Sequence, residues 1–161
     1  GLIMATYTAD RAASGLPVYK PTGAGLVCAA HGTYELASAP SANDIIEFCR
    51  VPKGAVIIGG WLRGDDIDTG TEAFEFDVGY AANGTDSADP DAFLNSGVIT
   101  GDVFATGNVS NVAGICYPLH GVLKDGPLTL SAETTIIGTV TAAANAGGTG
   151  TLSVTVLYVV P

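Results

Sequence analysis

The chain has 161 residues, 47% of them hydrophobic and only 14% charged, with a formal net charge of −10 from 6 Lys and Arg against 16 Asp and Glu. This length suits one domain with its own hydrophobic core. The shortage of cations excludes a protein that binds nucleic acid or an anionic membrane surface directly, because both partners require clustered positive charge. The 22 Gly and the low charge are untypical of a helical bundle and indicate a β-rich domain with many turns.

The N-terminal part of the sequence has little hydrophobic periodicity. Pro17 and Pro21 stand among glycines, which favours an extended backbone. Asp10 is the one acid in residues 1–34, which also contain Arg11 and Lys20. The net charge of this part is therefore close to zero, whereas the rest of the chain is strongly acidic. The basic and apolar stretches of a signal peptide are not found here. We expect residues 1–34 to form an extended N-terminal arm and residues 35–161 to form one β-sandwich domain.

Short strands are predicted along most of the remaining sequence, separated by turns rich in Gly, Pro, Asn and Asp. Alternating or continuous apolar residues mark 44–51, 55–62, 72–82, 98–103, 115–118, 127–133, 134–144 and 151–160. The last two segments flank the small-residue sequence "NAGGTG" and are expected to form a hairpin. In the final strand, Leu157 and Val159 make the second face apolar as well, which predicts that this end is buried on both sides.

One short helix is predicted at Asp89–Leu94. Asp89 is a good N-cap, and Pro90 suits the first helical position because its missing N–H group has no helical acceptor there. Antiparallel strands at this spacing imply a sandwich or a barrel. We therefore expect an all-β fold, an antiparallel jelly-roll-like β-sandwich with an extended N-terminal arm and one short helix.

Cysteine and histidine offer one candidate metal site. Cys28 with His31, and Cys116 with His120, are short pairs that a fold could join into a tetrahedral zinc site. The spacing matches no zinc-finger pattern well. Together with Cys49 the chain has three cysteines, an odd number that favours reduced thiols in a protein assembled in a reducing cytoplasm. We favour buried thiols and ordinary histidines, without metal or cofactor.

Other kinds of binding or catalytic site have weaker support in the sequence. Two acidic turns could hold a cation loosely, but neither follows the EF-hand ligand spacing: Asp65, Asp66 and Asp68 in the first, and Asp86, Asp89 and Asp91 in the second. There is no Gly-x-Ser-x-Gly elbow and no phosphate-binding loop. Trp61 lies in an apolar run and is expected in the core, which leaves few aromatic platforms for a sugar. The sequence therefore predicts a protein that is not an enzyme.

Four motifs resemble those of a known family. They are the turn at Pro52-Lys53-Gly54-Ala55 before an apolar strand, the strand end Asp77-Val78-Gly79-Tyr80, the segment Asp89–Leu94, and the closing "GTGTLSVTVLYVVP". Over residues 45–161 the sequence resembles the β-sandwich head decoration (cement) proteins of tailed bacteriophages. The resemblance does not extend over the N-terminal arm.

The resemblance implies a structural virion protein, a homotrimer on the outer capsid surface that binds the major capsid protein and stabilises the shell by bridging capsomers. Aromatic, apolar and basic residues of the arm are candidate capsid contacts, because such residues dominate interfaces: Tyr7, Arg11, Leu16, Val18, Tyr19 and Lys20. Two alternatives stay open. One is another virion β-module, such as a tail, fibre or minor capsid protein, and the other is a carbohydrate-binding β-sandwich.

Overall fold

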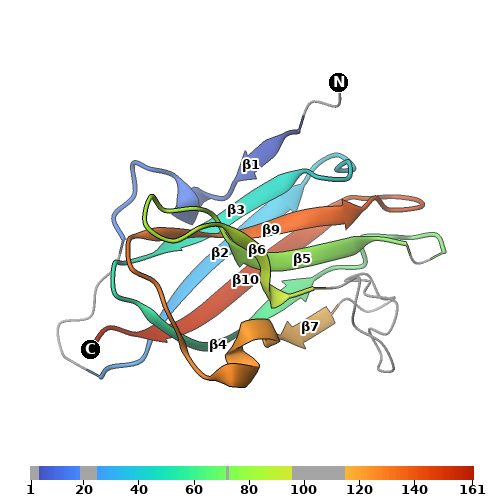
Figure 1. The fold of residues 1–161 in the computed structure, drawn as a ribbon. Helices are drawn as coiled ribbons and strands as arrows, with labels where there is room; N and C mark the ends of the chain where they lie inside the picture. Colours follow the sequence, from blue (N-terminus) through green and yellow to red (C-terminus); the bar gives the residue numbers. More distant parts are fainter. Residues whose placement is uncertain (1–3, 19–24, 72, 96–114) are drawn as a thin grey trace.

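The computed structural model describes residues 4–18, 25–71, 73–95 and 115–161. In these ranges the chain forms two β-sheets packed face to face (Figure 1). The first sheet contains, in spatial order, β1 (Thr6–Thr8), β3 (Ile45–Val51), β9 (Thr134–Ala142), β5 (Glu75–Tyr80) and β6 (Asp89–Leu94). The second contains β2 (Cys28–Leu36), β10 (Gly150–Val159), β4 (Val56–Gly64) and β7 (Ile115–Pro118), with β8 (Leu128–Thr129) also paired to β4. Two 3-10 helices, η1 (Asp10–Ala12) and η3 (Gly121–Asp125), complete the described elements.

The strands pair in a nested order. β2 pairs with β10, β3 with β9, β4 with β7 and β5 with β6, all antiparallel. The chain is therefore one long antiparallel ribbon whose tip lies between β5 and β6, rolled into two sheets, which is the jelly-roll arrangement. The expected all-β sandwich is confirmed. β1 is the exception to the antiparallel pattern, since it runs parallel to β3 at the edge of the first sheet.

Aromatic rings fill the space between the sheets. The ring of Phe76 lies edge-on to Phe48, with centroids 6.1 Å apart, and stacks on Phe74 at 6.0 Å. Gly138 in β9 leaves room for these rings, because a Cβ atom there would lie 2.1 Å from Cζ of Phe76. A glycine normally weakens a strand interior, so its place here follows from the bulk of its neighbours.

The predicted helix at Asp89–Leu94 is wrong, because this segment is strand β6. It pairs with β5 and buries Phe93 and Leu94 in the core. Pro90 is tolerated since β6 is an edge strand of its sheet, where a missing N–H group breaks no ladder. The capping signal is local, whereas pairing with β5 buries two large apolar side chains, and burial outweighs the cap. The helical turns of the described ranges, η1 and η3, lie elsewhere.

The predicted hairpin of the last two strands is also wrong. β9 belongs to the first sheet and β10 to the second, so the loop between them crosses from one sheet to the other. Gly147 and Gly148 adopt φ angles of 76° and 88° in this loop, a region that favours glycine. The strand expected at 98–103 lies outside the described residues. No helix in the described ranges has the length and apolar character needed to cross a membrane.

Two strands of the sandwich, β1 and β2, contain residues of the N-terminal segment. β2 spans the expected boundary between residues 34 and 35, and it pairs along its length with β10. β1 adds a strand to the other sheet. The structure thus places the start of the sandwich within the stretch where the sequence predicts an arm.

A buried carboxylate holds the crossing loop. Asp68, which is 1% exposed, accepts hydrogen bonds from four backbone N–H groups. The donors are Gly70 (3.1 Å), Ala73 (2.9 Å), Asn145 (2.7 Å) and Ala146 (3.0 Å). Burial by itself would raise the pKa of Asp68, but these hydrogen bonds outweigh it and hold the pKa below its ordinary value. The β4–β5 loop is thereby joined to the β9–β10 loop.

Replacing Asp68 by Ala should lower the free energy of unfolding at neutral pH by about 1–3 kcal/mol, because several loop N–H groups lose a charged acceptor. A depressed native pKa means that this contribution is present at neutral pH and is lost as the pH falls through the native pKa. Urea unfolding at several pH values measures both effects. Asp125→Ala, which removes an exposed pair with Lys124, is the matched control and should change little. Equal losses in the two variants would contradict this role for Asp68.

Candidate functional site

The N-terminal segment covers the side of the sandwich where β2 and β3 face each other. η1 packs against both strands, and its region buries Ala9 and Ala12. The two strands come unusually close here, because a Cβ atom at Gly32 would lie 1.8 Å from the carbonyl oxygen of Phe48. Two sheets that approach in this way need a glycine, and the N-terminal segment then covers the remaining gap.

Asp44 fixes the first part of this segment. Its buried carboxylate accepts hydrogen bonds from the N–H groups of Ala5 (3.0 Å) and Ser41 (2.9 Å), and from the hydroxyl of Tyr7 at 3.5 Å. The ring of Tyr7 also packs on Tyr34 of β2, with centroids 5.6 Å apart. Burial, and then the charge of Asp44, raise the pKa of Tyr7. Tyr7 is therefore a contact within the chain.

Arg50 fixes the second part of the N-terminal segment, the residues that follow η1. Its guanidinium donates hydrogen bonds to the backbone carbonyl oxygens of Ala13, at 3.0 Å, and Leu16. It also pairs with Glu133 at 2.9 Å. The Arg50 side chain is only 15% exposed, while that of Glu133 is 51% exposed, and the contact with the Ala13 carbonyl is better shielded than the ion pair. The planar guanidinium can hold several acceptors at once, which fixes the course of the chain after η1.

A bulge in β3 places the Arg50 side chain next to the residues that follow η1. The register of β3 against β9 shifts between Glu47 and Cys49, so Phe48 and Cys49 are both buried. Simple alternation predicts instead that these two side chains lie on opposite faces. Burial raises the pKa of Cys49 to about 12, and nearby Arg11 partly counters that effect. The thiol is therefore inert near neutral pH.

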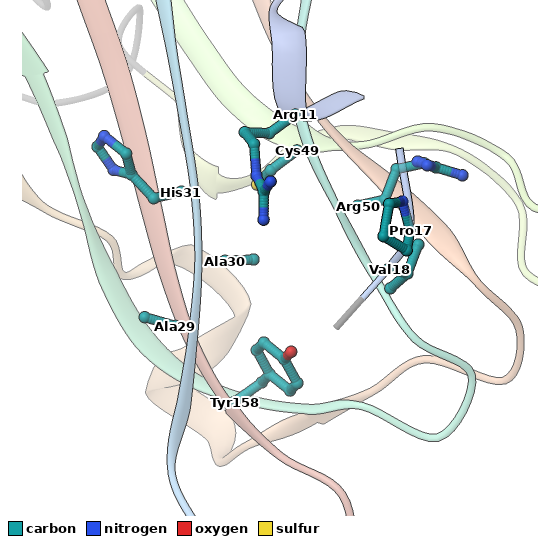
Figure 2. Close-up of a pocket in the computed structure, with 9 residues that line it drawn as sticks. All are labelled: Arg11, Pro17, Val18, Ala29, Ala30, His31, Cys49, Arg50 and Tyr158. Carbon is teal, nitrogen blue, oxygen red and sulfur yellow. The ribbon is translucent and has the colours of Figure 1, made fainter. Parts of the chain in front are cut away.

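A small hollow lies between this segment and the strands beneath it (Figure 2). Its volume is about 40 Å³, and we call it the Arg11 hollow. It is lined by Arg11, Pro17, Val18, Ala29, Ala30, His31, Cys49, Arg50 and Tyr158. A second, more open hollow of about 220 Å³ adjoins it, sharing Arg11 and His31. Figure 2 shows the Arg11 guanidinium entering from one end and the Tyr158 hydroxyl facing it from the other.

The structure describes four of the six predicted arm contacts. Tyr7 is half-buried against its own body, Arg11 and Leu16 are exposed, and Val18 lines the Arg11 hollow. Tyr19 and Lys20 lie outside the described residues. Arg50 was not among the predicted contacts, although a cation within a mostly apolar strand is a signal that could have pointed to it.

The two Cys/His pairs are not brought together. β2, which carries Cys28 and His31, and β7, which carries Cys116, are opposite edges of the second sheet, with β10 and β4 between them. Adjacent strands lie about 4.8 Å apart, so these edges are separated by roughly 14 Å. Cys28 faces the interior, His31 faces outward, and His120 follows β7 on the surface. Among the described residues no three Cys, His, Asp or Glu side chains are placed to hold a metal ion.

The acidic turns have structural partners. In the first, Asp68 accepts the four N–H groups described above, and Asp65 accepts from the N–H of Thr151 at 2.9 Å. In the second, Asp86 accepts from the side chain of Asn83 and from the N–H of Ser131, and these hydrogen bonds lower its pKa. Burial, followed by the neighbouring Asp91 carboxyl, raises the pKa of Asp89. These carboxylates hold loops in place.

Trp61 is not in the core as expected. It lies half-exposed on the outer face of β4, with the guanidinium carbon of Arg63 5.9 Å from its ring centroid. An inner-face position is taken by Leu62, which is fully buried. The apolar run 55–62 shows no clear alternation of inward and outward side chains in the sequence. Near Gly59 the register of β4 against β10 shifts, which changes the side chains that point inward.

Chains from three phage capsids share this fold. One from the capsid of Ralstonia phage GP4 has a TM-score of 0.74 and 22% identity, covering 98% of this chain and 99% of that chain. One from the cyanophage Pam1 capsid asymmetric unit has a TM-score of 0.66 and 19% identity, covering 92% and 96%. One from the acidic stable capsid of Helicobacter pylori bacteriophage KHP30 has a TM-score of 0.55 and 15% identity, covering 86% and 91%. No family model and no curated protein matches the sequence.

Replacing Arg50 by Ala should release the segment after η1, because the carbonyl contacts with Ala13 and Leu16 are lost. Limited trypsin digestion then measures cleavage after Arg11, which should become faster. Cleavage after Arg63, within β4, is the internal control and should stay slow. Arg50→Lys should give an intermediate rate, since a point-like ammonium cannot hold all three acceptors. Parallel acceleration at both sites would indicate global unfolding and contradict a local clamp.

Proposed function

We propose that this chain is a structural protein of a phage particle, which binds the outer surface of the capsid and stabilises the shell by bridging capsomers. The observation that carries the proposal is the end-to-end match to chains of phage capsids, with 98% of this chain covering 99% of the Ralstonia phage GP4 chain. A jelly roll alone would not support it, because such folds host many functions. The match includes the N-terminal part, and it recurs in two further capsids.

The charge supports an outward position. A chain with a net charge of −10 is repelled by nucleic acid, so the outer surface suits it better than the DNA-facing side. The proposed partner is the major capsid protein, and the proposed location is the virion surface after assembly in the host cytoplasm. Of the predicted arm contacts, the exposed Arg11 and Leu16 are the proposed ones, since Tyr7 is engaged within the chain. Such a role needs no catalytic group.

Mixing the purified chain with shells of the major capsid protein encoded beside it tests this function. We expect co-sedimentation in a copy number that scales with the number of shell subunits, because a decoration protein repeats with the lattice. Leu16→Asp should weaken binding by placing a charge among exposed apolar contacts, whereas Lys53→Gln in the β3–β4 turn should not. A few copies per particle would indicate a tail or minor component, and no binding would overturn the proposal.

We also propose that the chain assembles as a homotrimer through one end of the outer face of the second sheet. Val27, just before β2, comes together there with Ile58 of β4 and with Leu157 and Val159 of β10, and Val27 and Ile58 are 60% and 42% exposed. The sequence pattern predicts burial on both faces at this end of β10, yet the single chain leaves the outer side partly uncovered. A second copy is the favoured occupant, because no charged residue belongs to this cluster and copies that meet elsewhere bring acidic surfaces together.

Ile58→Asp should therefore convert the trimer to monomers, since it would bury a charge in each interface. Native mass spectrometry measures the change. Thr33→Asp, at the polar end of the same outer face, is the control and should leave the assembly intact. A wild-type monomer, or a trimer that survives Ile58→Asp, would contradict this interface without bearing on shell binding by the N-terminal segment.

A further inference from the structure

Arg11 is an exposed cation directed into a hollow. Its guanidinium enters the Arg11 hollow from η1, with Cys49 behind it and Ala30 below (Figure 2). Among the described residues, neither of the ion pairs that the structure forms involves Arg11. The adjacent Asp10 lines the neighbouring, larger hollow and not this one. The guanidinium therefore has donors directed toward a space that contains no acceptor carboxylate.

The lining of the hollow is positive in a strongly acidic protein. Of the chain's 6 Lys and Arg, two line this single space, and none of its nine lining residues is acidic. Arg50 is already bonded to Glu133 and to two carbonyl oxygens, so it shapes the wall and adds charge. Arg11 is left to meet a ligand, with the Tyr158 hydroxyl facing it across the hollow (Figure 2).

The size of the hollow restricts the ligand. Its volume of about 40 Å³ compares with roughly 10–15 Å³ for one water on the same scale, and with roughly 300–1,000 Å³ for a site that takes a small molecule. A sugar or a nucleotide is therefore too large for this hollow alone. A planar carboxylate fits, and it is also the group whose geometry matches two parallel N–H donors of a guanidinium. Apolar walls from Pro17, Val18 and Ala30 would limit screening of the pair by water.

We propose that the Arg11 hollow is a binding site for one carboxylate, supplied by an Asp or Glu side chain of the shell subunit on which the chain sits. The site requires the N-terminal segment to be folded onto β2 and β3, because Arg11, Pro17 and Val18 form its outer wall. The inserted side chain would then tie the shell to the element that closes the sandwich. The identity of the donor rests on the proposed function, whereas carboxylate binding by the hollow does not.

The first experiment tests the hollow in the free protein with acetate as the probe. Two-dimensional amide NMR of the full chain follows titration with sodium acetate at constant ionic strength, with acetamide as the uncharged analogue. We expect saturable shifts at Ala30, Cys49 and Arg50 with acetate and none with acetamide. Arg11→Gln should abolish them, while Lys53→Gln, which removes one charge from a turn outside the hollow, should not. Non-saturating shifts, or shifts that survive Arg11→Gln, would overturn the site.

The second experiment tests the source of the carboxylate. Arg11→Gln should weaken co-sedimentation with shells by roughly 30-fold or more, as expected for loss of one partner of a shielded charge pair, and Lys53→Gln should not. Unchanged shell binding by Arg11→Gln, with acetate binding lost, would overturn the assignment to a shell subunit. Native mass spectrometry of Arg11→Gln gives a further check. If this variant no longer self-assembles, the carboxylate comes from a second copy of the chain, and the assignment to a shell subunit is overturned. Wild-type protein that binds acetate but no shells would overturn the proposed function and this source, and leave the site itself standing.

Discussion

The close approach of β2 and β3 is the constraint on which the rest of the N-terminal region depends. A sandwich of two twisted sheets has open sides, and apolar residues near an open side lose their cover. Here Gly32 lets one strand meet the backbone of the other at Phe48, and η1 covers what remains of the gap. The segment that precedes the jelly roll thus completes its core. The packing of η1 on β2 and β3 makes this segment part of the folded domain, independently of any contact that it makes in a phage particle.

Charge in this protein is concentrated in a few anchoring positions. Asp44 and Asp68 are buried carboxylates that accept several backbone N–H groups each, and Arg50 donates to two carbonyl oxygens. Hydrogen bonds to charged groups are stronger than those between neutral groups, so each anchor can hold a loop that has little apolar surface of its own. All three join segments far apart in the sequence. Loops rich in Gly and Ala are thereby held without a large hydrophobic contribution.

The outer surface offers three chemically different regions to partners. The chain as a whole is acidic, one end of the second sheet is apolar, and the Arg11 hollow is basic. A protein that repeats on a curved shell must avoid its own copies over most of its surface and meet selected partners at defined places. In the proposed arrangement, copies of the chain meet at the apolar end and the shell meets the Arg11 hollow. The fold provides the rigid frame, and these regions carry the proposed specificity.

By itself, the sequence determined where most of the strands lie. Alternating apolar residues located β3, β4, β5, β7 and β10 to within a few residues, because the pleat requires one face of each strand to be buried. Composition was enough to indicate a β-rich, acidic domain. Tertiary structure decided which strand pairs with which, since the same alternation suits a hairpin and a crossing between sheets, and so β9 and β10 lie in different sheets. It also turned Asp89–Leu94 from a capped helix into an edge strand and brought Arg11 and Arg50 into one hollow, because burial against residues far along the chain outweighs any signal carried by neighbours in sequence.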